Sequence, residues 1–243
     1  MLHLPDVTIV CIDNVAQDLA RMALRDTLRL IKPAEVLFWT DGGGTEPERD
    51  WIGARELAFH ERGREAADQP LWYEVPFAVK TSHFLTVQWD GWVINASAWD
   101  PAFLDYDYIG APWPWHRSGQ QVGNGGFSLR SRRLMRFLAE RRGNLPYRYP
   151  EDDLIGRHYR PALEAAGFRF APVELAARFS FEHGRPSFPT FGYHDLRNWG
   201  WLLSDDEIDA RLDAASAYVV KKTELIAQML KNRDAIRALQ GRP

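Results

Sequence analysis

The 243-residue sequence has one cysteine, no apolar run of roughly 20 residues and little excess charge. The single cysteine, Cys11, excludes an intrachain disulfide and fits a reducing compartment, and its apolar neighbours predict that it is buried. No basic segment followed by an apolar core opens the sequence, so we expect no signal peptide and no membrane-spanning helix. We therefore expect a cytoplasmic protein, with peripheral contact at the inner face of the membrane as an option.

The net charge of −3 argues against a broad nucleic-acid-binding surface, and we expect no nucleic-acid partner. The sequence also lacks internal repeats and low-complexity tracts. Its hydrophobic content of 45% is ordinary for a globular protein, so the length predicts one main domain. Ten tryptophans are many for this length, and indole rings stack on sugars and bases as well as packing in cores.

The first 40 residues predict a strand, a helix and a second strand. Residues 7–12 and 36–39 are short apolar runs, and residues 16–31 between them have helical spacing. Such a βαβ unit belongs to an α/β fold, whose ligands gather beyond the carboxyl ends of the strands. Four polar residues at these ends are candidates for binding a nucleotide: Asp13, Asn14, Thr40 and Asp41.

The rest of the chain alternates between helical and strand-like segments. We predict helices over 48–63, 132–141 and 151–166, and strands over 71–75 and 84–89. From residue 204 onward the chain reads as helical, with acidic residues in the first turn. We therefore divide the chain into a domain over 1–203 and a helical extension over 204–243. The apolar positions of the extension predict packing on the domain or on a second copy of the chain.

Asp90 is a candidate metal ligand. It follows the predicted strand 84–89 and precedes Gly91, and a carboxylate there can hold Mg²⁺ or Mn²⁺ together with a diphosphate. The alternative is an ordinary Asp-Gly turn at a strand end. His194 is the candidate second ligand, and its alternative is a hydrogen-bonded structural histidine.

Two further segments have both a chemical and a structural interpretation. The glycines around Asn124, from Gly123 to Gly126, let the backbone approach a ligand closely, but Asn-Gly is also a strong hairpin signal. The acids at 151–153 follow a proline, as at many helix starts. One of them could instead face a cleft and accept a proton from a hydroxyl group.

Five segments in fixed order resemble a family of bacterial proteins of the DUF5672 type, which look like GT-A glycosyltransferases. They are residues 87–91 (VQWDG), 106–113 (YDYIGAPW), 123–131 (GNGGFSLRS), 150–152 (PED) and 191–194 (FGYH). The resemblance extends over roughly residues 5–198. It implies a Rossmann-like mixed sheet flanked by helices, a nucleotide-sugar donor and a divalent cation, Mn²⁺ or Mg²⁺.

The resemblance also implies roles for single residues. The metal motif of GT-A enzymes is commonly Asp-x-Asp; here it reads Gln88-Trp89-Asp90, which keeps the direct ligand Asp90 but makes the first position uncharged. His194 matches the late histidine that completes the metal shell. Asp152, with Asp153 as its rival, matches the base of inverting transferases. The remaining implied positions are donor-side Gln88 and Gly91, and acceptor-side or loop residues Trp113, Trp115, Asn124, Gly125 and Gly126.

The implied activity is transfer of a sugar from a nucleotide-diphosphate sugar, by default a uridine one, to a hydroxyl group of a glycan or another acceptor. The setting would be polysaccharide or glycoconjugate synthesis at the bacterial surface, with inversion at the anomeric carbon. Gln88 leaves open an alternative, a non-catalytic module that binds nucleotide sugars or glycans. A nucleotidyltransferase ranks last, because no glycine-rich basic loop follows the first strand.

Overall fold

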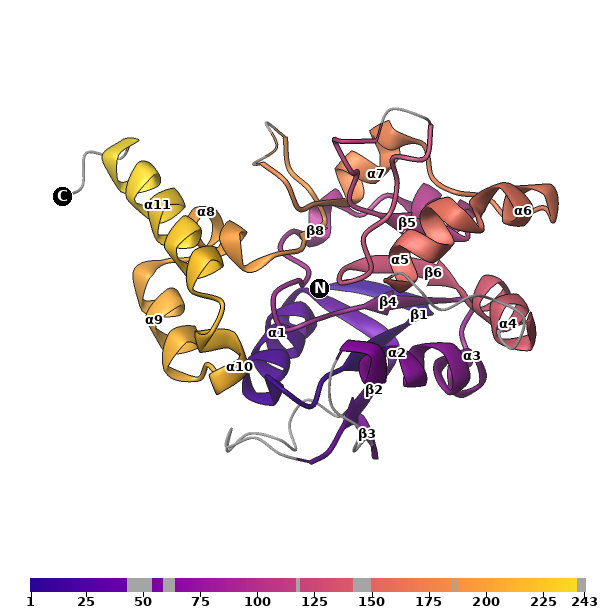
Figure 1. Cartoon of the computed structure of the whole chain (residues 1–243), viewed down its shortest axis with the longest axis horizontal. Coiled ribbons are helices and arrows are strands. Elements are labelled where there is room, and N and C mark those ends of the chain that lie inside the picture. Colours follow the sequence, from indigo (N-terminus) through magenta and orange to yellow (C-terminus); the bar gives the residue numbers. More distant parts are fainter. Residues whose placement is uncertain are drawn as a thin grey trace.

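The computed structural model describes residues 1–42, 54–58, 64–116, 119–141, 150–184, 186 and 188–239 (Figure 1). Its centre is a mixed sheet with strand order β3-β2-β1-β4-β6-β5. The strands are β1 (Leu2–Ile12), β2 (Ile31–Thr40), β3 (Arg55–Ala58), β4 (His83–Thr86), β5 (Tyr108–Gly110) and β6 (Ser128–Ser131). The first four run parallel, and β6 is antiparallel to both β4 and β5. The predicted α/β class, a mixed sheet flanked by helices with a C-terminal helical extension, is confirmed.

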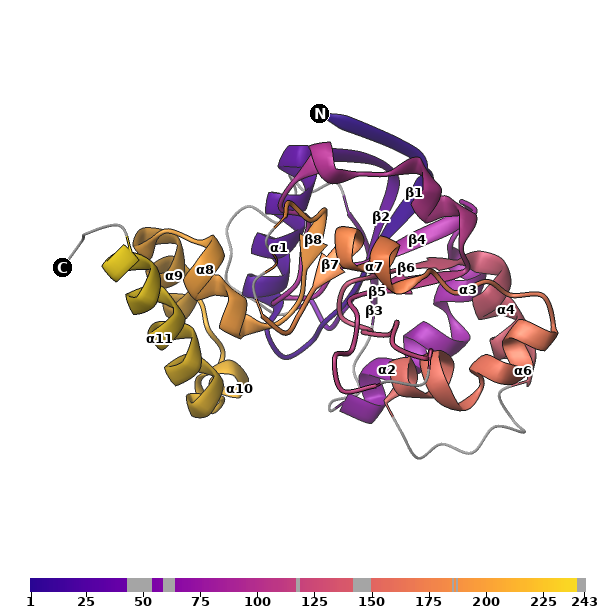
Figure 2. The same cartoon turned by 90° about the horizontal axis from the view of Figure 1, so that it is seen from above.

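Helices cover both faces of the sheet. Successive side chains of a strand point to opposite faces, so the strands contribute to two buried clusters. Ile9 and Cys11 of β1 share one buried cluster with α1 (Gln17–Leu30) and α7 (Val173–Phe179). Val10, between them, joins a second cluster with α2 (Arg64–Tyr73), α3 (Val75–Ala78) and α4 (Arg132–Arg141). Figures 1 and 2 show α1 on one side of the sheet and α2, α3 and α4 on the other. The predicted strand–helix–strand start is thus confirmed.

Three sequence predictions need correction. Residues 71–73 end α2 and Val75 begins α3, with Glu74 in the turn between them. Leu71, Trp72 and Val75 are buried in the cluster on this face of the sheet, and a short apolar run does not distinguish helix from strand. Within the predicted helix 48–63, residues 55–58 form β3 beside β2, and the rest lies outside the described residues, apart from Ala54. The predicted helix 151–166 is divided into α5 (Glu151–Asp153), a π-helical turn (Leu154–His158) and α6 (Arg160–Ala165).

The C-terminal helices pack on the rest of the chain. They are α8 (Trp199–Leu202), α9 (Asp205–Asp213), α10 (Ala217–Val220) and α11 (Thr223–Leu239). A capping box between Ser204 and Glu207 begins α9. Arg211 of α9 forms an ion pair with Asp26 of α1 and lies over the ring of Trp92. Association of copies through these helices stays a prediction. In the described part of the chain no helix combines the length and the apolar character needed to cross a bilayer.

Gly200 of α8 should be intolerant of alanine. A Cβ atom there would lie 2.2 Å from the carbonyl oxygen of Met229 and 2.6 Å from the backbone nitrogen of Arg233, both on α11. Alanine is favoured over glycine by about 1 kcal/mol in a helix, but overpacking against rigid backbone costs roughly 1–3 kcal/mol. We expect Gly200→Ala to lower the free energy of unfolding, measured by urea titration. An equal or greater stability would contradict the packing of α11 against α8.

Candidate active site

Three aspartates follow the three central parallel strands, at one edge of the sheet. Asp13 comes after β1, Asp41 after β2 and Asp90 shortly after β4. Because the chain leaves β1 for β2 on one side and reaches β4 on the other, their carboxyl ends flank the switch point where α/β sheets bind ligands. The structure therefore brings the predicted donor-side residues and the predicted metal ligand to the same edge.

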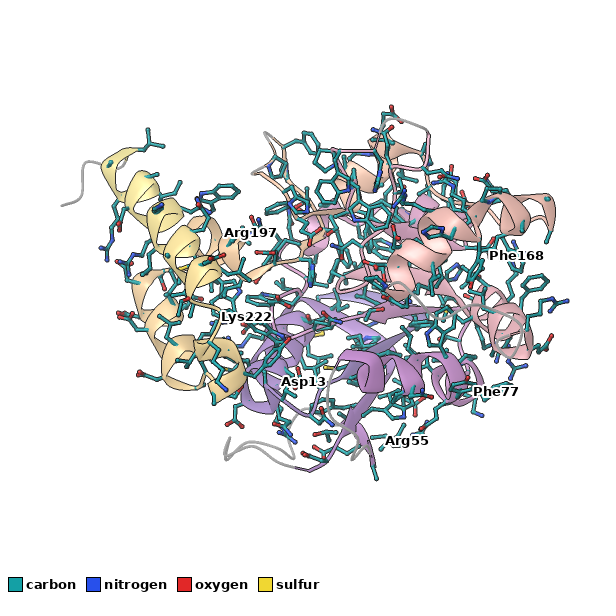
Figure 3. All side chains as sticks on the ribbon, in the orientation of Figure 1. Asp13, Arg55, Phe77, Phe168, Arg197 and Lys222 are labelled. Atoms are coloured by element: carbon teal, nitrogen blue, oxygen red, sulfur yellow. The ribbon has the colours of Figure 1, made fainter. Side chains whose placement is uncertain are left out.

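Asp13 shapes the turn into α1. Its Oδ1 accepts hydrogen bonds from the backbone nitrogens of Val15 (2.8 Å) and Ala16 (2.6 Å), and the side chain lies buried beside α1 (Figure 3). Burial, with smaller contributions from the charges of Asp90 and Asp41, raises the pKa of Asp13 to about 6. The charge of Asp90 thus acts on the ionisation of Asp13.

The other donor-side candidates are also at this edge. Asn14 and Thr40 are buried, and Thr40 Oγ1 accepts from the backbone nitrogen of Gly42 at 3.4 Å. Asp41 accepts from the amide nitrogen of Gln17. Nucleotide binding by these residues stays a prediction.

Asp90 lies in a two-residue turn. Gln88 and Gly91 exchange backbone hydrogen bonds of 3.1 Å in both directions, which leaves Trp89 and Asp90 as the turn residues. Trp89 packs edge-on against Trp199. Oδ1 of Asp90 is buried without a hydrogen-bond partner and lies 3.4 Å from Nε2 of His194. A buried carboxylate oxygen is stabilised by a positive charge or a donor, which protonated His194 or a bound cation would supply here.

His194 is held by a pair of short parallel strands, β7 (Ser180–Phe181) and β8 (Gly192–Tyr193). Its backbone nitrogen donates to the carbonyl of Phe181 at 2.9 Å, and its Nδ1 lies 3.3 Å from Oε1 of Glu182. Burial lowers the pKa of His194, but the carboxylates of Asp90 and Glu182 outweigh it and raise the pKa well above its usual value.

Glu182 is a site residue that the sequence analysis did not identify. Its two oxygens contact different histidines, Oε1 with His194 and Oε2 with His183 at 2.9 Å. Burial raises the pKa of Glu182, but the hydrogen bonds with His183 and His194 bring it well below its usual range. The only signal in the sequence is the position of Glu182 directly after a short apolar segment. The pairing of β7 with β8 is what brings Glu182 next to His194.

The pair Asp90 and His194 fits a divalent cation. Nδ1 of His194 lies 3.3 Å from Oε1 of Glu182 and 3.2 Å from the amide nitrogen of Asn124, and Nε2 faces Asp90. A cation between Nε2 and Asp90 would displace the Nε2 proton that the raised pKa favours, and Nδ1 would then donate to Glu182, the usual arrangement of a metal-binding histidine. Two atoms 3.4 Å apart can both reach one ion at bond lengths of about 2.1 Å. In the described ranges no cluster of three or more His, Cys, Asp or Glu side chains could hold a metal. Two protein ligands suit an ion that shares its other positions with water and phosphate oxygens.

The segment from Gly123 to Gly126, called the glycine segment below, lies against His194 on one side and against Glu151 on the other. A Cβ atom on Gly126 would lie 2.0 Å from Nε2 of His194, and one on Gly125 would lie 2.3 Å from Oε1 of Glu151. Asn124 adopts a φ of +68° and accepts a hydrogen bond from the nitrogen of Phe127 at 3.2 Å. The segment is therefore a tight turn, and its glycines also make room for the side chains of the site.

The three acids at the start of α5 have different partners. Glu151 forms an ion pair with the fully buried Arg130 of β6. Asp153 faces its own helix, where it contacts Arg157 at 2.8 Å and His158 at 3.3 Å. Asp152 Oδ2 accepts from the backbone nitrogen of Gly125 at 3.0 Å.

Asp152 has the properties of a base that works near neutral pH. Burial, and then the charge of Glu151, raise the pKa of Asp152 to about 7. A general base is most effective when its pKa lies near the working pH. Of the two predicted bases, Asp152 is the one that contacts the glycine segment.

The two predicted loop tryptophans have different environments. Trp113 is buried, and its ring fills the space that a Cβ atom on Gly123 would need. Trp115 is 55% exposed and meets the ring of His183 edge-on, at a centroid distance of 4.5 Å. Only Trp115 therefore offers an open ring beside the Glu182–His194 pair.

The sequence pattern of a family described as "Protein of unknown function (DUF5672)" matches residues 64–194. The chain belongs to this family. The DUF5672 segment contains Asp90, the glycine segment, Asp152, Glu182 and His194, whereas Asp13 and Asp41 lie before it. A comparison with curated proteins gave no match.

Solved structures similar to the chain include two glycosyltransferases. One is the mannosyltransferase PcManGT from Pyrobaculum calidifontis in complex with GDP-Man and Mn²⁺, with 14% identity, a TM-score of 0.45, and coverage of 71% of this chain and 56% of that one. The other is a glycosyltransferase involved in the glycosylation of the major capsid of PBCV-1, with 13% identity, a TM-score of 0.45, and coverage of 86% of this chain and 100% of that one. A mycobacterial protein has 14% identity, a TM-score of 0.35 and 54% coverage of each chain. The chain thus spans a little over half the length of PcManGT.

Proposed function

We propose that this DUF5672 protein is a glycosyltransferase that moves a sugar from a nucleotide-diphosphate sugar to a hydroxyl group, with inversion at the anomeric carbon. We place the catalytic domain in residues 1–203 and treat 204–243 as a helical extension. Synthesis of a bacterial surface polysaccharide or glycoconjugate is the setting we propose.

One observation supports this proposal: adjacent glycines contact the Asp90–His194 pair on one side and Asp152 on the other. Gly126 lies against His194, next to Asp90, and Gly125 donates to Asp152. Adjacent Cα atoms are about 3.8 Å apart, so the two functions lie within the length of a small substrate group. A base beside a site for a diphosphate is what direct displacement of a nucleotide needs.

In the proposed reaction, Asp152 takes the proton from the acceptor hydroxyl. The hydroxyl oxygen forms its bond to the anomeric carbon while the bond from that carbon to the diphosphate oxygen breaks, and the electron pair leaves with the diphosphate. A Mn²⁺ or Mg²⁺ ion held by Asp90 and His194 would neutralise charge on the leaving diphosphate. On the donor side, we propose that Asn14, Thr40, Asp41 and Gln88 orient the nucleoside.

The function is tested by turnover with a donor panel. Uridine and guanosine diphosphate sugars are incubated with Mn²⁺ and methyl glycosides, and the released nucleoside diphosphate and the anomeric configuration of the product are measured by NMR. A product of inverted configuration supports the proposal, and a retained configuration overturns the role of Asp152. Binding of a nucleotide sugar without turnover on any acceptor overturns transfer in favour of a non-catalytic binding module.

The pH dependence of turnover follows from Asp152. The base works only when ionised, and its pKa is about 7, so kcat/KM should rise with pH through about 7 and then level. The residual rate of Asp152→Asn should lack this rise.

In the wild-type protein the raised pKa of Asp152 also means that the folded state holds this proton more tightly than the unfolded state, where the pKa is about 3.9. Asp152 therefore lowers stability as pH rises from about 4 to about 7.

A further inference from the structure

A second feature of the described residues is a cavity of about 350 Å³ beside β7 and β8. Its lining is mostly apolar: Ile94, Phe181, Pro186, Phe188, Pro189 and Leu202, together with the polar residues Asn95 and Thr190. Phe188 is 45% exposed and offers an open ring face. A mainly apolar concave site with a few polar groups is the usual form of a small-ligand site.

The two polar residues have hydrogen-bonding groups to spare. Oδ1 of Asn95 accepts from the backbone nitrogen (3.0 Å) and hydroxyl (2.6 Å) of Ser97, while its amide nitrogen has no partner among the described residues. The hydroxyl of Thr190 is buried and also unpartnered in the described part of the chain. Thr190 lines the cavity, and contact of its buried hydroxyl with a ligand requires that the side chain turn toward the cavity.

The cavity is lined by residues close in sequence to the candidate active site. Phe181 directly precedes Glu182, and Thr190 precedes His194 by four residues. The backbone nitrogens of Ile94 and Asn95 donate to the carbonyl of Phe191, at 3.0 and 3.2 Å. The segment that carries Asp90 therefore continues into the cavity wall, where it is hydrogen-bonded to the segment that carries His194.

We propose that this cavity binds the acceptor as a glycoside, with a pyranose ring against Phe188 and ring or hydroxyl oxygens on Asn95 and Thr190. The role of the bound glycoside as acceptor rests on the proposed function. The C–H face of a pyranose suits an aromatic ring, and its oxygens match the unpartnered amide and hydroxyl. An alkyl chain would fill the apolar walls and leave both polar groups without partners.

Saturation-transfer NMR with methyl glycosides of glucose, galactose, mannose and N-acetylglucosamine, and with n-octyl β-glucoside, tests this directly. The variants are Phe188→Ala, which removes an exposed ring, and Thr190→Val, which keeps the side-chain shape. The control is Phe77→Ala, an equally exposed phenylalanine on α3, far from β8 in Figures 1 and 3. Nucleotide-sugar binding is followed separately by thermal shift.

We expect at least one glycoside to bind the wild type and the control through its ring protons. Its dissociation constant should rise about 3- to 10-fold in Phe188→Ala and in Thr190→Val. Thr190→Val should at the same time keep or raise the melting temperature, because it removes an unpartnered buried hydroxyl, and a purely structural role predicts the opposite.

Three results contradict the proposals and can be told apart. Undiminished glycoside binding in both variants, or no binding to the wild type, overturns the cavity assignment even if sugar transfer is detected. Signals confined to the octyl chain overturn it in favour of an apolar ligand. Cavity-dependent glycoside binding in a protein that binds no nucleotide sugar supports the cavity as a glycan site and overturns transfer.

Discussion

Replacing Asp152 by asparagine should lower kcat by about 100- to 10,000-fold while the nucleotide sugar still binds. General-base catalysis contributes a factor of this size, and the loss of one ionisable oxygen removes it. Asp152 contacts the backbone of Gly125 and Asp153 and none of the proposed donor-side residues. The donor dissociation constant, measured by thermal shift or calorimetry, should therefore stay within a few-fold of the wild type.

The matched control is the neighbouring Asp153→Asn. Asp153 forms partly exposed contacts with Arg157 and His158 on its own helix, and such pairs contribute little, about 0–1 kcal/mol. Its kcat should change by less than about threefold. Should Asp152→Asn fold poorly, Asp152→Ala with added formate or azide gives a second test. Recovery of rate by the small anion requires a missing base, and a variant that keeps wild-type kcat excludes Asp152 from the chemistry.

The parts of the fold that could be predicted depend on contacts close in sequence. The strand–helix–strand start follows from the local spacing of apolar residues, and the carboxyl ends of its strands locate Asp13 and Asp41 at one edge. Residues 71–75 could not be assigned in the same way. Their run of apolar residues suits either a buried strand or a helix packed on the sheet, and only the packing of Trp72 decides.

Prediction of the candidate site from the sequence has the same limit, because its residues meet through contacts between distant parts of the chain. The resemblance to GT-A enzymes was enough to pair Asp90 with His194, and the structure places these residues 3.4 Å apart. Which of the acids at 151–153 faces the site could not be predicted. It depends on Arg130, a buried residue of β6 that forms an ion pair with Glu151. Glu182 could not be found for a similar reason, since it meets His194 through the pairing of two strands of two residues each.

Replacing Asp90 by asparagine should abolish the stabilisation of the protein by a nucleoside diphosphate with Mn²⁺. A ligand present at 100 times its dissociation constant stabilises the folded state by about 2.7 kcal/mol, which for a chain of this size raises the melting temperature by roughly 5–10 °C. The asparagine keeps the size of the side chain but removes the charge, and the unpartnered Oδ1 beside His194 loses most of its affinity for a cation.

Two further variants show whether the effect belongs to the position or only to the charge. Asp105→Asn removes one negative charge at an exposed residue of the 3₁₀ segment Pro101–Asp105 and should keep the full shift. Gln88→Asp adds a carboxylate two residues before Asp90 and should tighten the dependence on Mn²⁺, since a second acidic oxygen near the ion raises its affinity. A Mn²⁺-dependent shift that survives in Asp90→Asn would place the cation elsewhere. Loss of the shift in Asp105→Asn as well would reduce the effect to net charge. The expected pattern, loss at Asp90 alone and gain at Gln88, requires a cation at the end of β4.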